Sequence, residues 1–260
     1  MGLFGKKDRG KAGQFIFLTE QIFSMGQIGI AAVGTVSGKV HVGDAVYLYH
    51  PGVPLAAARV DKLELAPGRG AEEAENCMVS LHFENMRQEN IKRFSVFSNI
   101  RPDQMAEQKA TVENPQLRGL LSGYAKFEKE PEFLRLFHYS IAHAKFMMAV
   151  FADGTNLSFP TVANTDGTSA IPVFTDPEAL LRWQNVFDEK HPKKTAVQTF
   201  GEAAALSQNG NDGIVINPFD DAPYFLSNDL ITKICRYIKR KKTVKREDVM
   251  SSLCGEFRIK

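Results

Sequence analysis

The sequence predicts an α+β protein of two domains, an N-terminal antiparallel β-barrel followed by a mixed α/β domain. Its 260 residues suggest two domains, because single domains commonly hold about 100–200 residues. Short apolar runs between Gly, Pro and Asp clusters recur up to about Ile100, and helical and extended patterns alternate after Asn114. We therefore expect a flexible N-terminus at 1–14, a barrel at 15–101, a linker at 102–113, an α/β domain at 114–238 and a basic tail at 239–260.

The composition indicates an ordinary globular protein. With 43% hydrophobic and 24% charged residues and a net charge of +2, the chain as a whole has no strong attraction to nucleic acid or membrane. Cys77, Cys235 and Cys254 are far apart, which favours a reduced cytoplasmic protein over a disulfide or zinc framework. No apolar run approaches the about 20 residues of a transmembrane helix, and Lys6 breaks the N-terminal myristoylation pattern.

The run "GTVSGKVHVGDAVYLYH", residues 34–50, predicts strands and tight turns. Val40 and Val42 alternate with polar residues, which is the period of a half-buried strand. Gly38 and Gly43 fit chain reversals because glycine accepts a positive φ without a Cβ clash. The glycines of this run are explained by chain direction and require no ligand.

Residues 15 to 100 resemble the second, β-barrel domain of translational GTPases such as elongation factor Tu. The family's Gly-x-Val-x-x-Gly-x-Val-x-x-Gly-Asp run is matched, with its second glycine one residue early, by Gly34, Val36, Gly38, Val40, Gly43 and Asp44. The family's closing segment is matched at Met86, Arg87, Ile91, Lys92 and Arg93. The resemblance implies a barrel that contacts RNA, the ribosome or another protein domain.

GTP hydrolysis is not expected from this chain. The phosphate-binding motif Gly-x-x-x-x-Gly-Lys-[Ser/Thr] and the guanine-specifying Asn-Lys-x-Asp motif are both missing from the sequence. We assign no catalytic residue, no cofactor and no metal, and the sequence favours a non-enzymatic role.

The barrel's cations allow two interpretations. If the barrel binds RNA, the available cations are Lys39, Arg59, Lys62, Arg69, Arg87, Lys92 and Arg93. The favoured interpretation is that they are ordinary solvated charges, because neighbouring acids balance them: Glu64, Glu72, Glu73, Glu75, Glu84 and Glu89. Arg87, Lys92 and Arg93 remain the barrel's candidate interaction residues.

The second half alternates helices and strands. "NPQLRGLLSGYAKF" and "EPEFLRLFHYSIAHA" predict helices that begin near proline, "KFMMAVF" predicts a buried strand, and a hairpin is expected to turn at Asp166-Gly167. A helix over 177–190 is expected to begin at an Asp176 cap. Its buried face is predicted to carry Leu180, Leu181, Trp183 and Phe187. The last helix is "SNDLITKICRYIKR".

Four segments of this half resemble the N-terminal domain of the SseB family. They are "ENPQLRGLL", "FMMAVF", "AIPVFTDPEALLRW" and "GIVINPF", of which Pro172 to Leu180 is the most specific. The resemblance implies a compact bacterial α/β domain, found alone or beside other modules, and supplies no reaction.

The polar residues of this half can be explained by structural roles, without a ligand or metal site. Thr175 and Asp176 fit a helix cap, and Asn217, Asp220 and Asp221 fit a polar turn between a strand and a helix rather than a cation site. His138 and His143 lie about 140° apart on a helix, so they do not share a face as zinc ligands would.

The C-terminal region is the one strongly basic stretch. It carries Arg236, Lys239, Arg240, Lys241, Lys242, Lys245 and Arg246. It is either an anchor to RNA, DNA or an acidic membrane surface, or a solvated helix end stabilised by the helix dipole. Charge alone leaves both interpretations open.

Taken together, these features predict a non-enzymatic, cytoplasmic bacterial protein of two modules that acts as an adaptor through protein contacts, with RNA contacts also open. The alternative is an RNA- or ribosome-associated factor that uses the barrel and the basic tail. A third hypothesis is an enzyme whose site lies between the two domains.

Overall fold

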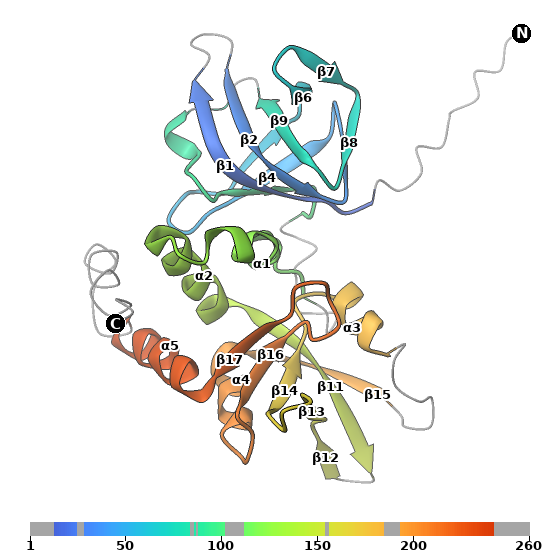
Figure 1. Ribbon diagram of the computed structural model, residues 1–260, viewed down its shortest axis with the longest axis vertical. Coiled ribbons are helices and arrows are strands. Elements are labelled where there is room, and N and C mark those ends of the chain that lie inside the picture. The colour runs from blue at the N-terminus through green and yellow to red at the C-terminus, as the bar shows by residue number, and fades with distance from the viewer. Residues whose placement is uncertain are drawn as a thin grey trace, which may run out of the picture. The chain divides into compact units, whose positions relative to one another are not determined.

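The computed structural model divides the chain into two compact units, residues 1–100 and 101–260 (Figure 1). It describes residues 13–24, 29–83, 86, 88–101, 112–153, 156–184 and 193–241. Most of the expected flexible N-terminus, linker and basic tail lies outside these ranges.

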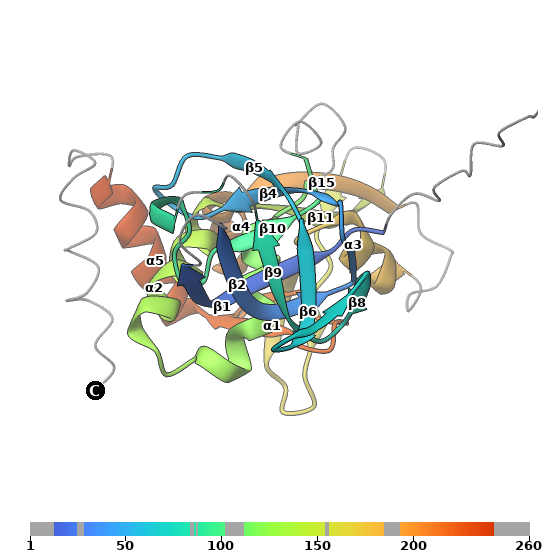
Figure 2. The same ribbon diagram turned by 90° about the horizontal axis from the view of Figure 1, so that it is seen from above.

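The first unit is an antiparallel half-barrel. One sheet has the order β5-β4-β10-β1-β2-β9-β6-β7, and β3 pairs with β8. Figure 2 shows β1, β2, β9 and β6 curling round one side of the unit. The strands are β1 (Ile16–Ser24), β2 (Ile30–Ser37), β3 (Lys39–His41), β4 (Ala45–Tyr49), β5 (Ala56–Arg59), β6 (Lys62–Ala66), β7 (Arg69–Ala71), β8 (Glu73–Glu75), β9 (Met78–Phe83) and β10 (Val96–Ser98).

Aromatic rings fill the half-barrel. Phe83 and Phe97 stack with centroids 4.4 Å apart, and Phe17 lies 6.2 Å from Phe97. All three side chains are buried in one hydrophobic core. The sheet curves because its strands pack round this core.

The glycines of the opening run act as the sequence predicts. Gly38 and Gly43 have φ of +85° and +89°, and Val40 between them is fully buried. Gly34 has a second reason to be glycine, because a Cβ there would lie 1.9 Å from the Leu18 carbonyl oxygen. These positions shape the strands and form no phosphate cradle.

The second unit is mixed α/β, which confirms the predicted fold class. Its helices are α1 (Pro115–Phe127), α2 (Pro131–His143), α3 (Pro177–Gln184), α4 (Phe200–Ser207) and α5 (Asn228–Lys241). Its strands are β11 (Lys145–Asp153), β12 (Asn156–Ser158), β13 (Val162–Ala163), β14 (Ser169–Val173), β15 (Lys193–Thr199), β16 (Gly213–Ile216) and β17 (Tyr224–Ser227).

Two small sheets meet in this unit. One has the order β12-β11-β15 and the other β13-β14-β16-β17. Met147 and Phe174 join them by exchanging two backbone hydrogen bonds of 2.9 Å. β14 and β16 run parallel, so both end at the same edge of the sheet. The helices predicted from the proline starts and the hairpin turning at Asp166-Gly167 are confirmed.

Two details of this unit were predicted wrongly. Leu181 is 54% exposed, whereas Leu180 and Trp183 are buried as expected. Phe187 and the rest of the predicted helix beyond residue 184 lie outside the described residues. The polar turn predicted at Asn217, Asp220 and Asp221 leads first into a further strand, β17, which pairs with β16, and not directly into the last helix.

Burial gives the free energy of unfolding of this unit a pH dependence. Burial on α2 lowers the pKa of His138 from 6.5 to about 4. Because the folded pKa is depressed, stability from the neutral ring is fully present above pH 6.5 and is lost as the pH falls to about 4. The loss is up to about 3 kcal/mol. His138→Gln should flatten this part of the pH dependence.

Urea unfolding between pH 7 and 4, followed by the fluorescence of Trp183, the only tryptophan, measures the effect. Equal losses of stability in the wild type and in His138→Gln would contradict it.

Candidate functional site

A polar cluster lies where β14 and β16 end. It consists of Glu113, Asn114, Arg118, Thr175, Asp176 and Asn217, and we call it the polar clasp. Its members come from three segments that are far apart in sequence: the start of α1, the end of β14 and the end of β16. The carboxyl end of parallel strands is where α/β proteins commonly place binding residues, which makes the clasp a candidate site.

The clasp joins β14 to β16 through a reciprocal pair of hydrogen bonds. The Thr175 backbone N–H donates to Asn217 Oδ1, and Asn217 Nδ2 donates to Thr175 Oγ1, each at 2.9 Å. Asn217 has a φ of +49°, a left-handed conformation that asparagine tolerates better than most residues. The residue therefore turns the chain sharply as it leaves β16.

Asp176 is the charged centre of the clasp and is only 2% exposed. Its Oδ1 accepts from the Ala179 backbone N–H at 3.0 Å, which confirms the predicted cap at the start of α3. Its Oδ2 accepts from the Thr175 hydroxyl at 2.6 Å and lies 3.4 Å from Arg118 Nε. Arg118 Nη1 in turn lies 2.9 Å from Glu113 Oε2.

Asn114 ties the start of α1 to both sheets. Its Nδ2 donates to the carbonyl oxygens of Lys145 at 2.9 Å and Thr175 at 2.7 Å. The clasp therefore uses its polar groups to fasten parts of the domain together. The clasp geometry therefore indicates a structural role in holding these segments together.

The chain that leaves the clasp forms a loop held by an ion pair. Arg182 Nε on α3 donates to Asp220 Oδ1 at 2.7 Å, and Arg182 Nη1 lies 3.1 Å from Glu178 Oε1. Asp220 thus stabilises the predicted polar turn by binding Arg182. Within the described ranges, no three His, Cys, Asp or Glu side chains gather in a way that could hold a metal ion.

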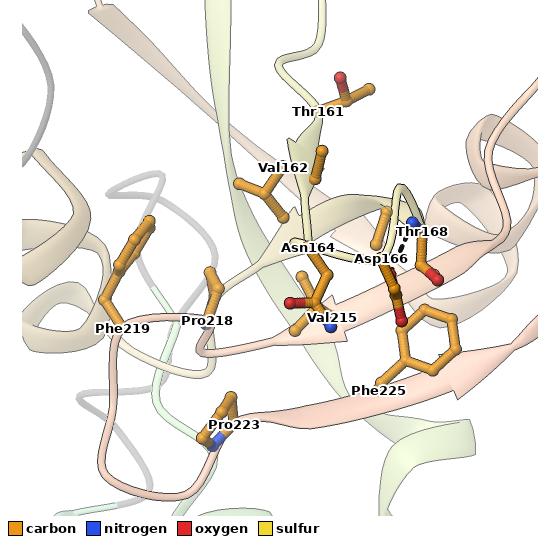
Figure 3. A pocket seen from close by; sticks show the side chains of 12 residues that line it. Thr161, Val162, Asn164, Asp166, Thr168, Val215, Pro218, Phe219, Pro223 and Phe225 are labelled. Carbon is orange, nitrogen blue, oxygen red and sulfur yellow. Dashed lines mark hydrogen bonds between the residues drawn. The ribbon is translucent and has the colours of Figure 1, made fainter.

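Beside this loop lies a hollow of about 700 Å³, which we call the sheet groove (Figure 3). Figure 3 shows Phe219 and Pro218 on one side of it, Phe225 on another, and the Asn164–Thr168 turn at its border. The lining is Thr161, Val162, Ala163, Asn164, Asp166, Thr168, Ala170, Val215, Pro218, Phe219, Pro223 and Phe225. The groove thus combines the β13–β14 turn, residues of the four strands β13, β14, β16 and β17, and the loop after the clasp.

Strand alternation explains why apolar side chains line the groove. Ile214, Ile216 and Leu226 are buried in a sheet that α4 and α5 pack against. Val215 and Phe225 point to the opposite face, and the two pair directly in register. Phe225 is 42% exposed and Phe219 is 36% exposed. An exposed apolar patch of this kind commonly marks a binding surface.

Gly213 on β16 allows the neighbouring strand β17 to approach closely within the same sheet. A Cβ at residue 213 would lie 2.0 Å from the Leu226 carbonyl oxygen and 3.1 Å from the Phe225 ring. Glycine therefore lets β17 and the Phe225 ring lie against β16.

Of the three candidate cations of the barrel, Arg93 contacts the barrel itself. Arg93 Nε donates to the Glu20 carbonyl oxygen at 3.1 Å, and its guanidinium lies 4.4 Å from the centroid of the Phe94 ring. Lys92 is exposed, and Arg87 lies outside the described residues.

Other barrel cations also have partners nearby. Lys39 Nζ lies 2.8 Å from Glu73 Oε1, and Lys62 Nζ lies 2.6 Å from Glu64 Oε1. Arg59 Nη1 donates a hydrogen bond to the Gly43 carbonyl oxygen. These pairs support the interpretation of the barrel charges as a balanced surface.

The candidate residues of the basic tail are only partly described. Arg236 is exposed on α5, and the backbones of Lys239, Arg240 and Lys241 form the last turn of that helix. Their side chains, and all of Lys242, Lys245 and Arg246, lie outside the described residues. Each helix in the described ranges falls short of the length and apolar content that crossing a membrane demands.

A comparison with protein-family models matches residues 117–233 to the family described as SseB protein N-terminal domain. The second unit contains an SseB N-terminal domain. No curated protein sequence matches the chain. The SseB domain includes the groove and most of the clasp, while the half-barrel lies outside the matched residues.

The clasp is built from the segments that carry the SseB resemblance. "ENPQLRGLL" supplies its α1 residues, "PVFTDPEAL" supplies Thr175 and Asp176, and "GIVINPF" supplies Asn217. Sequence reasoning found these motifs and missed the groove. One signal in the sequence could have indicated the groove: in "NPFDDAPYF", the aromatic residues Phe219 and Phe225 stand on either side of two aspartates, in a segment otherwise typical of a surface turn.

The clasp makes a prediction about stability. Asp176→Ala removes a helix cap and leaves Arg118 beside a vacated carboxylate position, so it should lower the free energy of unfolding by about 3 kcal/mol. Asp176→Asn keeps an acceptor for the cap and should cost about half as much. Glu178→Ala, which removes only an exposed ion pair with Arg182 on the same helix, should lower the free energy of unfolding by less than about 1 kcal/mol.

Urea unfolding followed by Trp183 fluorescence measures all three variants. Equal stabilities of Asp176→Ala and Glu178→Ala would show that the clasp does not fasten the domain.

Proposed function

We propose that the chain is a cytoplasmic bacterial binding protein without GTPase activity, whose SseB domain contacts a protein partner through the sheet groove. The observation that carries the proposal is the exposure of Phe219 and Phe225 beside an apolar groove. Such aromatic side chains supply much of the binding energy when a partner covers them.

The clasp supports this role because it fixes the groove before any partner arrives. Asn217 turns the chain directly into Pro218 and Phe219, and Arg182 holds Asp220 one residue further on. A preformed groove binds more tightly than one that must order first, because less conformational entropy is lost.

We assign the half-barrel the role of a second module, similar to the second domain of elongation factor Tu. The glycine turns and the curled antiparallel sheet support this assignment. The ion pairs of Lys39 and Lys62 with neighbouring acids favour a protein contact over an RNA contact for its surface.

Affinity capture from the native cell tests the function. Full-length chain with Phe225→Ser should lose at least one specific protein partner by tenfold or more. Leu181→Ser is the matched control, because Leu181 is a similarly exposed apolar residue of the same domain away from the groove lining, and it should retain that partner.

The proposal fails if every protein captured by the wild type is also captured by Phe225→Ser. It also fails if the captured material is RNA or ribosomes released by salt, which would support the RNA-associated factor instead.

A further inference from the structure

The segments that build the sheet groove are acidic. Residues 161–170 and 212–225 contain no Lys, Arg or His, and their carboxylates are Asp166, Asp212, Asp220 and Asp221. Asp166 lines the groove, Asp221 is exposed in the loop between Phe219 and Pro223, and Asp220 is engaged by Arg182. The negative charges at the border of the groove are therefore those of Asp166 and Asp221, since Arg182 offsets the charge of Asp220.

Asp166 keeps its charge at neutral pH. The Thr168 backbone N–H donates to its Oδ1 at 2.8 Å, and this bond lowers the pKa of the Asp166 carboxyl. The bond also fixes the carboxylate at the tip of the β13–β14 turn, beside the groove.

The groove is better suited to a polymer segment than to a small molecule. Sites for small molecules usually enclose about 70–90% of the ligand, whereas Phe219 and Phe225 stay 36% and 42% exposed at the border of this groove. A volume of about 700 Å³ gives room for a few side chains. Phosphate-rich ligands such as RNA would be repelled by the acidic border.

We propose that the sheet groove binds a peptide segment of a partner protein in which an apolar or aromatic residue is flanked by Lys or Arg. The apolar side chain packs on Val215 and Phe225, and the cations lie near Asp166 and Asp221. This inference rests on the proposed function and narrows it to one class of partner, because charge complementarity decides which apolar segments fit.

Selection from a displayed library of random heptapeptides tests the inference on the full chain. Enriched peptides should share an apolar or aromatic residue next to Lys or Arg. A synthetic copy of an enriched peptide should bind Phe225→Ser at least tenfold more weakly than the wild type, and should bind Leu181→Ser like the wild type.

The charge is tested by a double variant, Asp166→Asn with Asp221→Asn. Asparagine keeps the acceptor oxygen that Thr168 uses, so the turn is preserved. The synthetic peptide should bind this variant about 5- to 20-fold more weakly at low salt, and high salt should narrow the difference. Glu132→Gln, an exposed change on α2, controls for the loss of a negative charge and should bind within about twofold of the wild type.

The outcomes separate the two proposals. If enriched peptides depend on Phe225 but lack basic residues and bind the double Asn variant normally, this inference is wrong and the proposed function stands. If no peptide is enriched, or if binding does not depend on Phe225, this inference is wrong, and capture of protein partners by Phe225→Ser decides the proposed function. If Phe225→Ser instead converts a dimer of the chain into a monomer, the occupant is a second copy and the inference is overturned.

Discussion

The reciprocal hydrogen bonds between Thr175 and Asn217 are the constraint on which the surface of the SseB domain depends. They fix the ends of two parallel strands against each other, at the point where β14 leads into α3 and β16 leads into the loop of Pro218 and Phe219. Asp176 extends the same network to the start of α3 and to Arg118 on α1. The loop that follows Asn217, which Arg182 also holds at Asp220, is thereby positioned beside the exposed face of the sheet.

The two faces of this sheet differ: one is buried in the core of the domain, and the other lines the groove proposed for binding. Ile214, Ile216 and Leu226 are buried in a sheet covered by α4 and α5, and the burial of such side chains contributes about 1.5–3 kcal/mol each. Val215 and Phe225 take the alternate positions and line the groove. Because strand side chains alternate, the same short strands supply both the core and the proposed binding surface. In our proposal, the acidic border selects among apolar partners.

The sequence predicted features that depend on local rules. Prolines near helix starts, the Asp176 cap and the glycine turns are each set by neighbouring residues, and the structure confirms them. Leu181 was predicted wrongly because it lies roughly 100° round the helix from Leu180, which places it outside the buried arc. β17 is only four residues long, and its pairing with β16 follows from tertiary contacts. The groove combines segments about 50 residues apart along the chain, which no local pattern joins.

An NMR titration of the isotope-labelled full chain with a synthetic peptide enriched on it tests the central claim most directly. The account predicts that amide shifts concentrate in residues 162–170 and 213–225, and that Ala203 and Ala204 on α4, which packs against the sheet, change little. It also predicts that Phe225→Ser needs at least tenfold more peptide to show the same shifts. Shifts that concentrate on the half-barrel or on α4, with the groove residues unchanged, would contradict the account.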